Sequence, residues 1–193
     1  MPGDDVSIAL DLASSQFGGN GRYHLALEQQ ELGSDALRER LVRWIDKYPI
    51  VSIEDPLAED DEAGLVMFTR AVGERVQIVG DDYLVTNEDR VKHAASVGAC
   101  NCLLVKPNQA GTVTETRAAI DAATQAGFRT IVSARSGETE DVAIVHLAIG
   151  WNAGQLKVGS FSRSERMAKW NEAVRIESRS GLPFAGRAAL RRP

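Results

Sequence analysis

Cysteine, histidine and aromatic residues are scarce in this chain of 193 residues. It contains two cysteines, Cys100 and Cys102, three histidines, and 6% aromatic residues. Two cysteines are too few for the dense disulfide framework of a small secreted domain. Their C-x-C spacing leaves a redox or metal-binding pair open, but two small buried strand residues in a reducing compartment are the simpler interpretation. We therefore expect both thiols to be buried and free.

Long apolar runs and an excess of positive charge are also missing. No apolar segment approaches the roughly 18 residues of a membrane span. The first residues, MPGDDVSIALDL, lack the basic and apolar regions of a signal peptide. The net charge of −5 argues against a nucleic-acid partner, because a phosphate backbone needs a basic surface. These absences favour a cytoplasmic protein that binds neither a membrane nor nucleic acid.

What the chain does contain is a regular alternation of short apolar runs and helical stretches. In the stretch 34–48, the spacing of Leu37, Leu41, Trp44 and Ile45 predicts one apolar helix face, with Ser34 as the N-cap. The expected strands are residues 6–13, 50–55, 75–82, 100–107, 129–134 and 154–159. The expected helices are residues 34–48, 60–73, 87–98, 112–127, 138–150 and 162–177. This alternation of about six β-α units predicts a parallel sheet flanked by helices.

The positions of charged residues decide between the two folds that fit this alternation. A doubly wound sheet gathers ligands mainly at one switch point, whereas a β/α barrel collects side chains from the C-terminal ends of many strands. No Gly-x-Gly-x-x-Gly motif follows the first strand. The charged residues at or near different strand ends are Asp11, Glu54, Asp81, Lys106, Arg135 and Lys157. The sequence therefore predicts an α/β fold, a partial TIM-type barrel over residues 1–180, followed by a tail at 181–193.

About six units are fewer than the eight strands of a closed barrel. The sheet should therefore have two unpaired edges, at residues 6–13 and 155–159, and unpaired edges invite pairing with another chain. We expect the chain to form a homo-oligomer or to close on a partner chain.

Three carboxylates interrupt or end apolar strands, where an unpaired charge is costly: Asp11, Glu54 and Asp81. If the three converge, they offer the oxygen ligands that Mg²⁺ prefers. The alternative is that each one caps a following helix or pairs with a basic neighbour. Their placement on three different strands of one barrel favours the metal site.

Two lysines, Lys106 and Lys157, also end strands, and Pro107 biases Lys106 toward extended geometry. Most lysines are solvated surface groups, but two that face one site should lower each other's pKa, and a metal ion adds to this. A lysine with a lowered pKa is a suitable general base near neutral pH. Proton abstraction next to a carboxylate, with Mg²⁺ stabilising the enediolate, fits such a group.

The segment after the fifth strand, residues 131–141, reads IVSARSGETED. Arg135, Ser136 and the start of a helix expected near Glu138 would together suit a phosphate group. The alternative is a loop arginine that pairs with Glu138 or Glu140. Ala134, at the turn from strand to loop, offers no chemistry of its own.

Several of these stretches closely resemble enolase, the glycolytic phosphopyruvate hydratase. They are SIEDPLAEDD, VQIVGDD, ACNCLLVKPNQAGTVTET, SARSGETED and GQLKVGSFSRSERMAKWNEAVRIE, and they occur in order over nearly the whole chain. The resemblance implies a Mg²⁺-dependent lyase that converts 2-phosphoglycerate to phosphoenolpyruvate and water. It implies Mg²⁺ ligands at Asp11, Glu54 and Asp81. It also implies Lys106 as the base at C2, Lys157 at the substrate carboxylate, and Arg135 with Ser136 at the phosphate.

The departures from the enolase pattern define an alternative. Enolases have histidine where Ala134 stands, and they are more than twice this length. The part that precedes the ALDLASS strand in them carries the general acid. One expectation is therefore an enolase-type lyase barrel. The other is an enolase-derived protein without hydratase activity that binds Mg²⁺ or a phosphometabolite, or serves assembly.

Overall fold

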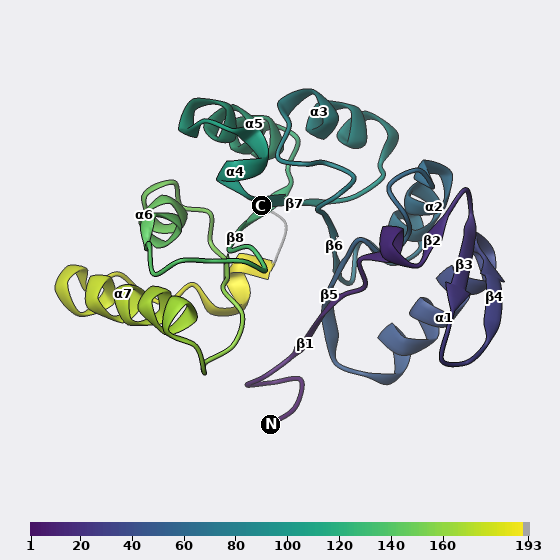
Figure 1. Ribbon diagram of the computed structural model, residues 1–193, viewed down its shortest axis with the longest axis horizontal. Helices are drawn as coiled ribbons and strands as arrows, with labels where there is room; N and C mark the ends of the chain where they lie inside the picture. Colours follow the sequence, from purple (N-terminus) through teal and green to yellow (C-terminus); the bar gives the residue numbers. More distant parts are fainter. Residues whose placement is uncertain (191–193) are drawn as a thin grey trace.

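Six parallel strands form the main sheet of the computed structural model, which describes residues 1–190. They are β1 (Ile8–Asp11), β5 (Ile50–Glu54), β6 (Gln77–Gly80), β7 (Cys102–Val105), β8 (Arg129–Ser133) and β9 (Leu156–Lys157). Their order in the sheet is the same as their order in the chain. The sheet curls into an open arc with the helices on its outer side (Figure 1). The predicted partial TIM-type barrel is confirmed.

The helices alternate with these strands as the sequence predicts. They are α1 (Ser34–Lys47), α2 (Glu62–Val72), α3 (Glu88–Val97), α4 (Pro107–Ala110), α5 (Val113–Gln125), α6 (Ala143–Gly150) and α7 (Ser164–Ser180), with short 3-10 turns η1 (Ser14–Gln16) and η2 (Gly186–Leu190). Asn87 caps α3 as expected, because its side chain accepts the N–H of Arg90 at 3.0 Å. The predicted cap at Ser34 is wrong: Gly33 is the N-cap of α1, and the Ser34 hydroxyl donates to Asp61 instead.

A small antiparallel sheet between β1 and α1 was not anticipated. It consists of β2 (Gly18–Gly19), β3 (Arg22–Leu25) and β4 (Gln30–Gly33). Asn20 and Gly21 have φ values of 50° and 71°, and an Asn-Gly pair with two positive φ angles suits the tight turn from β2 to β3. Figure 1 shows this sheet beside α1 and α2, at one end of the arc.

Buried apolar side chains lie on both faces of the main sheet. The larger cluster packs between the strands and the helices and includes Leu41, Ile53, Phe68 and Leu103. A smaller cluster of Val79, Cys102 and Leu104, with Ile131 packed against it, forms separately. The two cysteines belong to different clusters, Cys100 to the larger and Cys102 to the smaller. Both thiols are free and buried, as expected, and burial raises their pKa well above the ordinary value, which keeps them protonated.

At the N-terminal end of the strands, polar side chains join distant parts of the arc. The amides of Gln77 and Gln155 donate to each other's oxygens, at 3.0 and 2.9 Å. Gln155 also donates to the carbonyl of Ala189 at 3.3 Å, which attaches η2 to this end. Arg187 donates to the carbonyl of Asp4 at 3.0 Å, so the chain segments near the two ends are in contact. The predicted tail includes residues 191–193, which lie outside the described residues.

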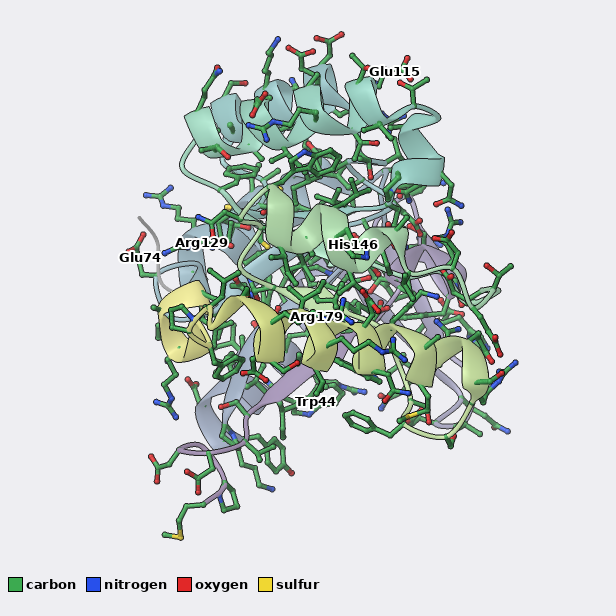
Figure 2. The ribbon with its side chains drawn as sticks, turned by 90° about the vertical axis from the view of Figure 1, so that its left-hand side faces the viewer. Trp44, Glu74, Glu115, Arg129, His146 and Arg179 are labelled. Atoms are coloured by element: carbon green, nitrogen blue, oxygen red, sulfur yellow. The ribbon has the colours of Figure 1, made fainter. Side chains whose placement is uncertain are left out.

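Helices α6 and α7 cover one side of the molecule and run side by side (Figure 2). His146 of α6 lies above α7 in this view and its Nε2 is 3.3 Å from Glu172 of α7. None of the helices in residues 1–190 combines the length and the apolar character that crossing a bilayer requires.

Candidate active site

The predicted site residues lie at the C-terminal edge of the curled sheet. Asp11, Glu54 and Lys157 are the last residues of β1, β5 and β9. Asp81 and Lys106 directly follow β6 and β7, and Arg135 lies in the loop after β8. The strand register places Asp11 opposite Glu54, and Lys157 opposite Ser133. The parallel strands thus bring these side chains from six positions in the chain to one edge.

Lys157 joins the carboxylates of two other strands. Its ammonium donates to Asp11 Oδ2 at 2.8 Å and to Glu54 Oε1 and Oε2 at 2.8 and 2.7 Å. The Glu54 side chain is 6% exposed, whereas those of Lys157 and Asp11 are 39% and 45% exposed. The contact is therefore a partly buried ion pair that links the two edge strands of the sheet through their side chains.

The environment of Glu54 favours its protonated form. Burial raises its pKa to about 7, the ammonium of Lys157 acts in the opposite direction, and the nearby charges of Asp11 and Asp81 raise it again. Both other predicted ligands thus act on Glu54 electrostatically. A buried carboxylate with two further carboxylates beside it is a place where bound positive charge is favourable.

The expected lowering of the Lys157 pKa is wrong. Burial alone would lower the pKa of this ammonium, but the charges of Glu54 and Asp11 and the hydrogen bonds to them raise it above its ordinary value. The direction of the pKa shift is decided by the contact of Lys157 with two carboxylates and not by a second lysine. Lys157 is therefore a charged group at neutral pH, which suits the binding of an anion and not proton abstraction.

The second lysine lies against the third carboxylate. Lys106 Nζ donates to Asp81 Oδ2, and the side chains are 13% and 12% exposed. Gln109 Nε2 donates to the other oxygen of Asp81 at 2.9 Å. Thr86 accepts the backbone N–H of Lys106 at 2.9 Å and donates to Gln109 at 2.8 Å. Gln109 and Thr86 were missed by the sequence analysis, because neither ends a strand.

The loop that carries Arg135 and Ser136 is held by α7. Arg166 of α7 donates to the carbonyls of Arg135, Ser136 and Val158, at 2.8, 2.8 and 2.9 Å. Lys169, which is 1% exposed, donates to Thr139 O at 2.8 Å and pairs with Glu138 at 2.9 Å. The rigidity of this loop thus depends on two buried cations that lie far along the chain.

Arg135 is oriented toward the short helix α4, which follows β7. Its Nη1 donates to Asn108 Oδ1 at 3.2 Å, and Glu138 accepts its backbone N–H at 2.8 Å. Glu138 thus pairs with the backbone of Arg135, while its ion pair is with Lys169. The expected helix start near Glu138 is wrong, since α6 begins at Ala143. Helix-start amides are therefore not adjacent to Ser136, and an anion here would depend on the guanidinium and the exposed hydroxyl.

Ala134 is buried and directly follows β8, the strand between β7 and β9, whose ends carry Lys106 and Lys157. Its N–H donates to the carbonyl of Lys157 at 2.9 Å, which continues the pairing of β8 with β9. Its methyl group cannot transfer a proton.

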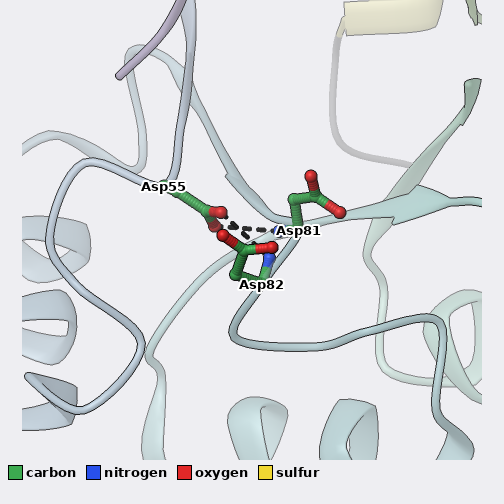
Figure 3. A group of neighbouring side chains, drawn as sticks. All are labelled: Asp55, Asp81 and Asp82. Carbon is green, nitrogen blue, oxygen red and sulfur yellow. Dashed lines mark hydrogen bonds between the residues drawn. The ribbon is translucent and has the colours of Figure 1, made fainter. Parts of the chain in front are cut away.

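A further group of carboxylates lies beside the predicted one. Asp55, Asp81 and Asp82 each have an oxygen within 4.8 Å of the others (Figure 3). Of these three, only Asp81 is predicted from the sequence, because Asp55 and Asp82 each directly follow a carboxylate already assigned to a strand end. The acidic side chains gathered at this edge offer carboxylate oxygens, which fit a hard cation such as Mg²⁺.

Residues 2–192 match the family model described as the enolase C-terminal TIM barrel domain. The chain belongs to the enolase family. It is 49% identical over 182 residues to the protein named Enolase 1 of Desulfitobacterium hafniense (strain Y51). That alignment covers 93% of this chain and 42% of the relative, so the chain spans less than half the length of that enolase.

Membership of the enolase family accounts for the position of the charged residues. The matched region is a barrel domain, and barrels assemble their sites from strand ends, as Asp11, Glu54 and Lys157 do here. The resemblance inferred from the motifs is thus confirmed at the level of family and fold.

Proposed function

We propose that the strand-end residues form the site of an enolase-type, Mg²⁺-dependent lyase. The family reaction converts 2-phosphoglycerate to phosphoenolpyruvate and water in glycolysis, in the cytoplasm. One observation carries the proposal: three carboxylates and two lysines from different strands form ion pairs at one edge of a barrel sheet. A site with this composition matches a substrate that has both acidic groups and an acidic C–H bond.

Asp11, Glu54 and Asp81 would hold the metal ion. The raised pKa of Glu54, caused by burial and by the other two carboxylates, supports this assignment, because a divalent cation would relieve that repulsion. When bound by these residues, the ion would supply positive charge next to the substrate carboxylate. Lys157, which is already charged, would then contact the carboxylate of the substrate.

Lys106 would remove the proton from C2 of 2-phosphoglycerate at its Nζ atom. This requires Lys106 to be unprotonated and free of Asp81, its present partner. Arg135 and Ser136 would bind the phosphate, since Arg135 donates to Asn108 through one of its five N–H groups and Ser136 is exposed.

Turnover tests the catalytic proposal directly. Phosphoenolpyruvate formation from 2-phosphoglycerate is followed in Mg²⁺ buffer for the parent chain, Lys106→Ala and Lys92→Ala. Lys92 is an exposed lysine on α3 that pairs with Glu88 and serves as the matched control. Turnover by the parent and Lys92→Ala, with loss in Lys106→Ala, would support the proposal. Absence of turnover by the parent chain would contradict the proposal that this chain is an enzyme.

The alternative is an enolase-derived protein that binds Mg²⁺ or a phosphometabolite without turning it over. Ala134 favours it, because the loop then provides an anion site without a proton-transfer group. Calorimetric titration of Mg²⁺ into the parent and into Asp81→Ala distinguishes the two. Mg²⁺ binding by a parent chain that shows no turnover supports the alternative. Equal Mg²⁺ affinities of the parent and Asp81→Ala would contradict the assignment of Asp81 as a ligand.

We also propose that the sheet edges associate with another chain. In residues 1–190, β1 and β9 each have a single neighbour in the sheet, and only side chains link them to each other. Unpaired backbone groups at such edges favour pairing with a second copy or a partner strand. Light scattering at micromolar concentration should give a mass above that of one chain, and a uniform monomer would contradict self-association.

A further inference from the structure

Asp55 has an unusual backbone conformation at the end of β5. It follows Glu54 directly, precedes Pro56, and has a φ value of 41°. Proline disfavours helical conformations in the residue before it, and positive φ is uncommon in residues other than glycine. The conformation is maintained by backbone hydrogen bonds on both sides, from Asp55 N–H to Val79 O at 3.0 Å and from Ser14 N–H to Asp55 O at 3.2 Å.

The carboxylate of Asp55 binds the backbone of the next strand end. Its Oδ1 accepts the N–H of Asp81 and its Oδ2 accepts the N–H of Asp82, both at 2.9 Å. Figure 3 shows both bonds, with the Asp81 carboxylate directed away from Asp55. The backbone of Asp81 is thus held by Asp55, while its carboxylate accepts hydrogen bonds from Lys106 and Gln109.

These two bonds argue against Asp55 as a metal ligand itself. Each of its oxygens already accepts a backbone N–H, although the side chain belongs to the group of three neighbouring aspartates. Asp55 is 4% exposed. A buried carboxylate beside two others is costly, so its presence indicates a task that a neutral side chain does not perform.

We infer that Asp55 is a positioning residue that orients Asp81, through the Asp81 and Asp82 backbone, as a ligand of the metal site. This inference rests on the proposed function, because it assumes that Asp81 binds Mg²⁺. An aspartate supplies two acceptors for two adjacent N–H groups, whereas asparagine supplies one acceptor and sets its NH₂ group against the other N–H. Asp55→Asn should therefore turn the Asp81–Asp82 peptide while it keeps the size of the side chain.

Mg²⁺ titration by calorimetry of the parent, Asp55→Asn and Asp61→Asn tests this role. Asp61 is the matched control: it is a buried carboxylate in the same β5–α2 loop, but it accepts from Tyr23, Ser34 and Gly64 and not from Asp81 or Asp82. Loss of a residue that orients a metal ligand typically lowers the affinity for the metal about 10- to 100-fold. We expect such a loss in Asp55→Asn and at most a small change in Asp61→Asn, at a temperature where all three are folded.

Amide hydrogen exchange gives a second reading that is independent of metal. The N–H groups of Asp81 and Asp82 should exchange faster in Asp55→Asn than in the parent or Asp61→Asn. Should Asp55→Asn not fold, Asp55→Ser, which offers one acceptor and no opposing NH₂ group, is measured in the same way.

The outcomes separate the two proposals. A parent chain that does not bind Mg²⁺ overturns the proposed function and this inference with it. A parent that binds Mg²⁺ with the same affinity as Asp55→Asn, or an equal loss in Asp61→Asn, overturns the inference alone. Unchanged exchange at Asp81 and Asp82 in the Asp55 variant overturns it as well.

Discussion

Lys157 on β9 donates to both carboxylate oxygens of Glu54 on β5, across three intervening strands of the sheet. The curvature of the sheet is what brings the two residues together. The ammonium of Lys157 thus lies between the carboxylates of Glu54 and Asp11. Any metal ion that binds these two carboxylates has to compete with it.

Lys157→Met should lower the stability of the metal-free chain and raise its response to Mg²⁺. The substitution leaves Glu54 buried without its partner, which typically costs about 3 kcal/mol for a buried pair and less for one this exposed. It also removes a positive charge that competes with a metal ion. Compared with the parent in thermal unfolding, the variant should have a lower Tm without Mg²⁺ and a larger increase in Tm when Mg²⁺ is added. Lys92→Met is the control, and an equal gain in both variants would contradict competition.

The metal-free chain should be more stable at pH 5 than at pH 8. Glu54 has a folded pKa of about 7, above its ordinary value of 4.5, so the folded state binds more protons than the unfolded state between these values. Stability therefore falls as pH rises through this window, by up to about 3 kcal/mol for a shift of this size. Urea unfolding in chelator buffer across this range measures the slope. Glu54→Gln should reduce this slope without removing it, because burial also raises the pKa of Asp55 to about 7. A slope unaltered by that change would exclude Glu54 as a source.

Arg166→Met should loosen the loop of Arg135 and Ser136. Three carbonyls lose a charged donor, and bonds of this kind contribute about 1.5–3 kcal/mol each in mutational series. We expect a loss of at least about 2 kcal/mol in urea unfolding and weaker binding of phosphoenolpyruvate in calorimetry. Arg175→Met, on the same helix, removes an ion pair between the exposed Arg175 and the partly buried Glu172, far from this loop's carbonyls, and should change both quantities much less.

Tyr23→Phe should destabilise the small antiparallel sheet. The Tyr23 hydroxyl donates to Asp61 at 2.7 Å and accepts the N–H of Ala58 at 3.0 Å, and the side chain is fully buried. Removing it leaves the buried N–H of Ala58 without this acceptor, while Asp61 keeps its bonds from Ser34 and Gly64, and the expected cost is about 1–3 kcal/mol. The free energy of unfolding measures this, with the exposed Tyr48→Phe as the control. Equal stability of the two variants would show that the hydroxyl bonds contribute nothing.

The sequence was sufficient for the strands that carry the site, because an apolar run followed by a charged residue marks a strand end. Glu54 and Lys106 were located in this way. The small sheet was missed since β2 has two residues and its one local signal is the Asn20-Gly21 turn. That dipeptide, flanked by Gly18 and Tyr23, was the signal that would have indicated it.

The remaining errors concern interactions between distant residues. The start of α6 was misplaced because Arg166 and Lys169 hold residues 135–139 as a loop, and neither is near this loop in the sequence. The pKa of Lys157 was predicted in the wrong direction because a sequence does not show that Glu54 lies closer to it than Lys106 does. Local pattern predicts elements, whereas the sign of an electrostatic effect depends on which charges meet.

The order of the strands has a consequence for how the chain folds. Each strand of the main sheet pairs with the next one in the chain, so the arc can grow by one β-α unit at a time with short loops to close. The bond from Lys157 to Asp11 spans 146 positions in the sequence and can form only when all six strands are in place. It should therefore be absent from the rate-limiting transition state, and its removal should speed unfolding while leaving the refolding rate nearly unchanged.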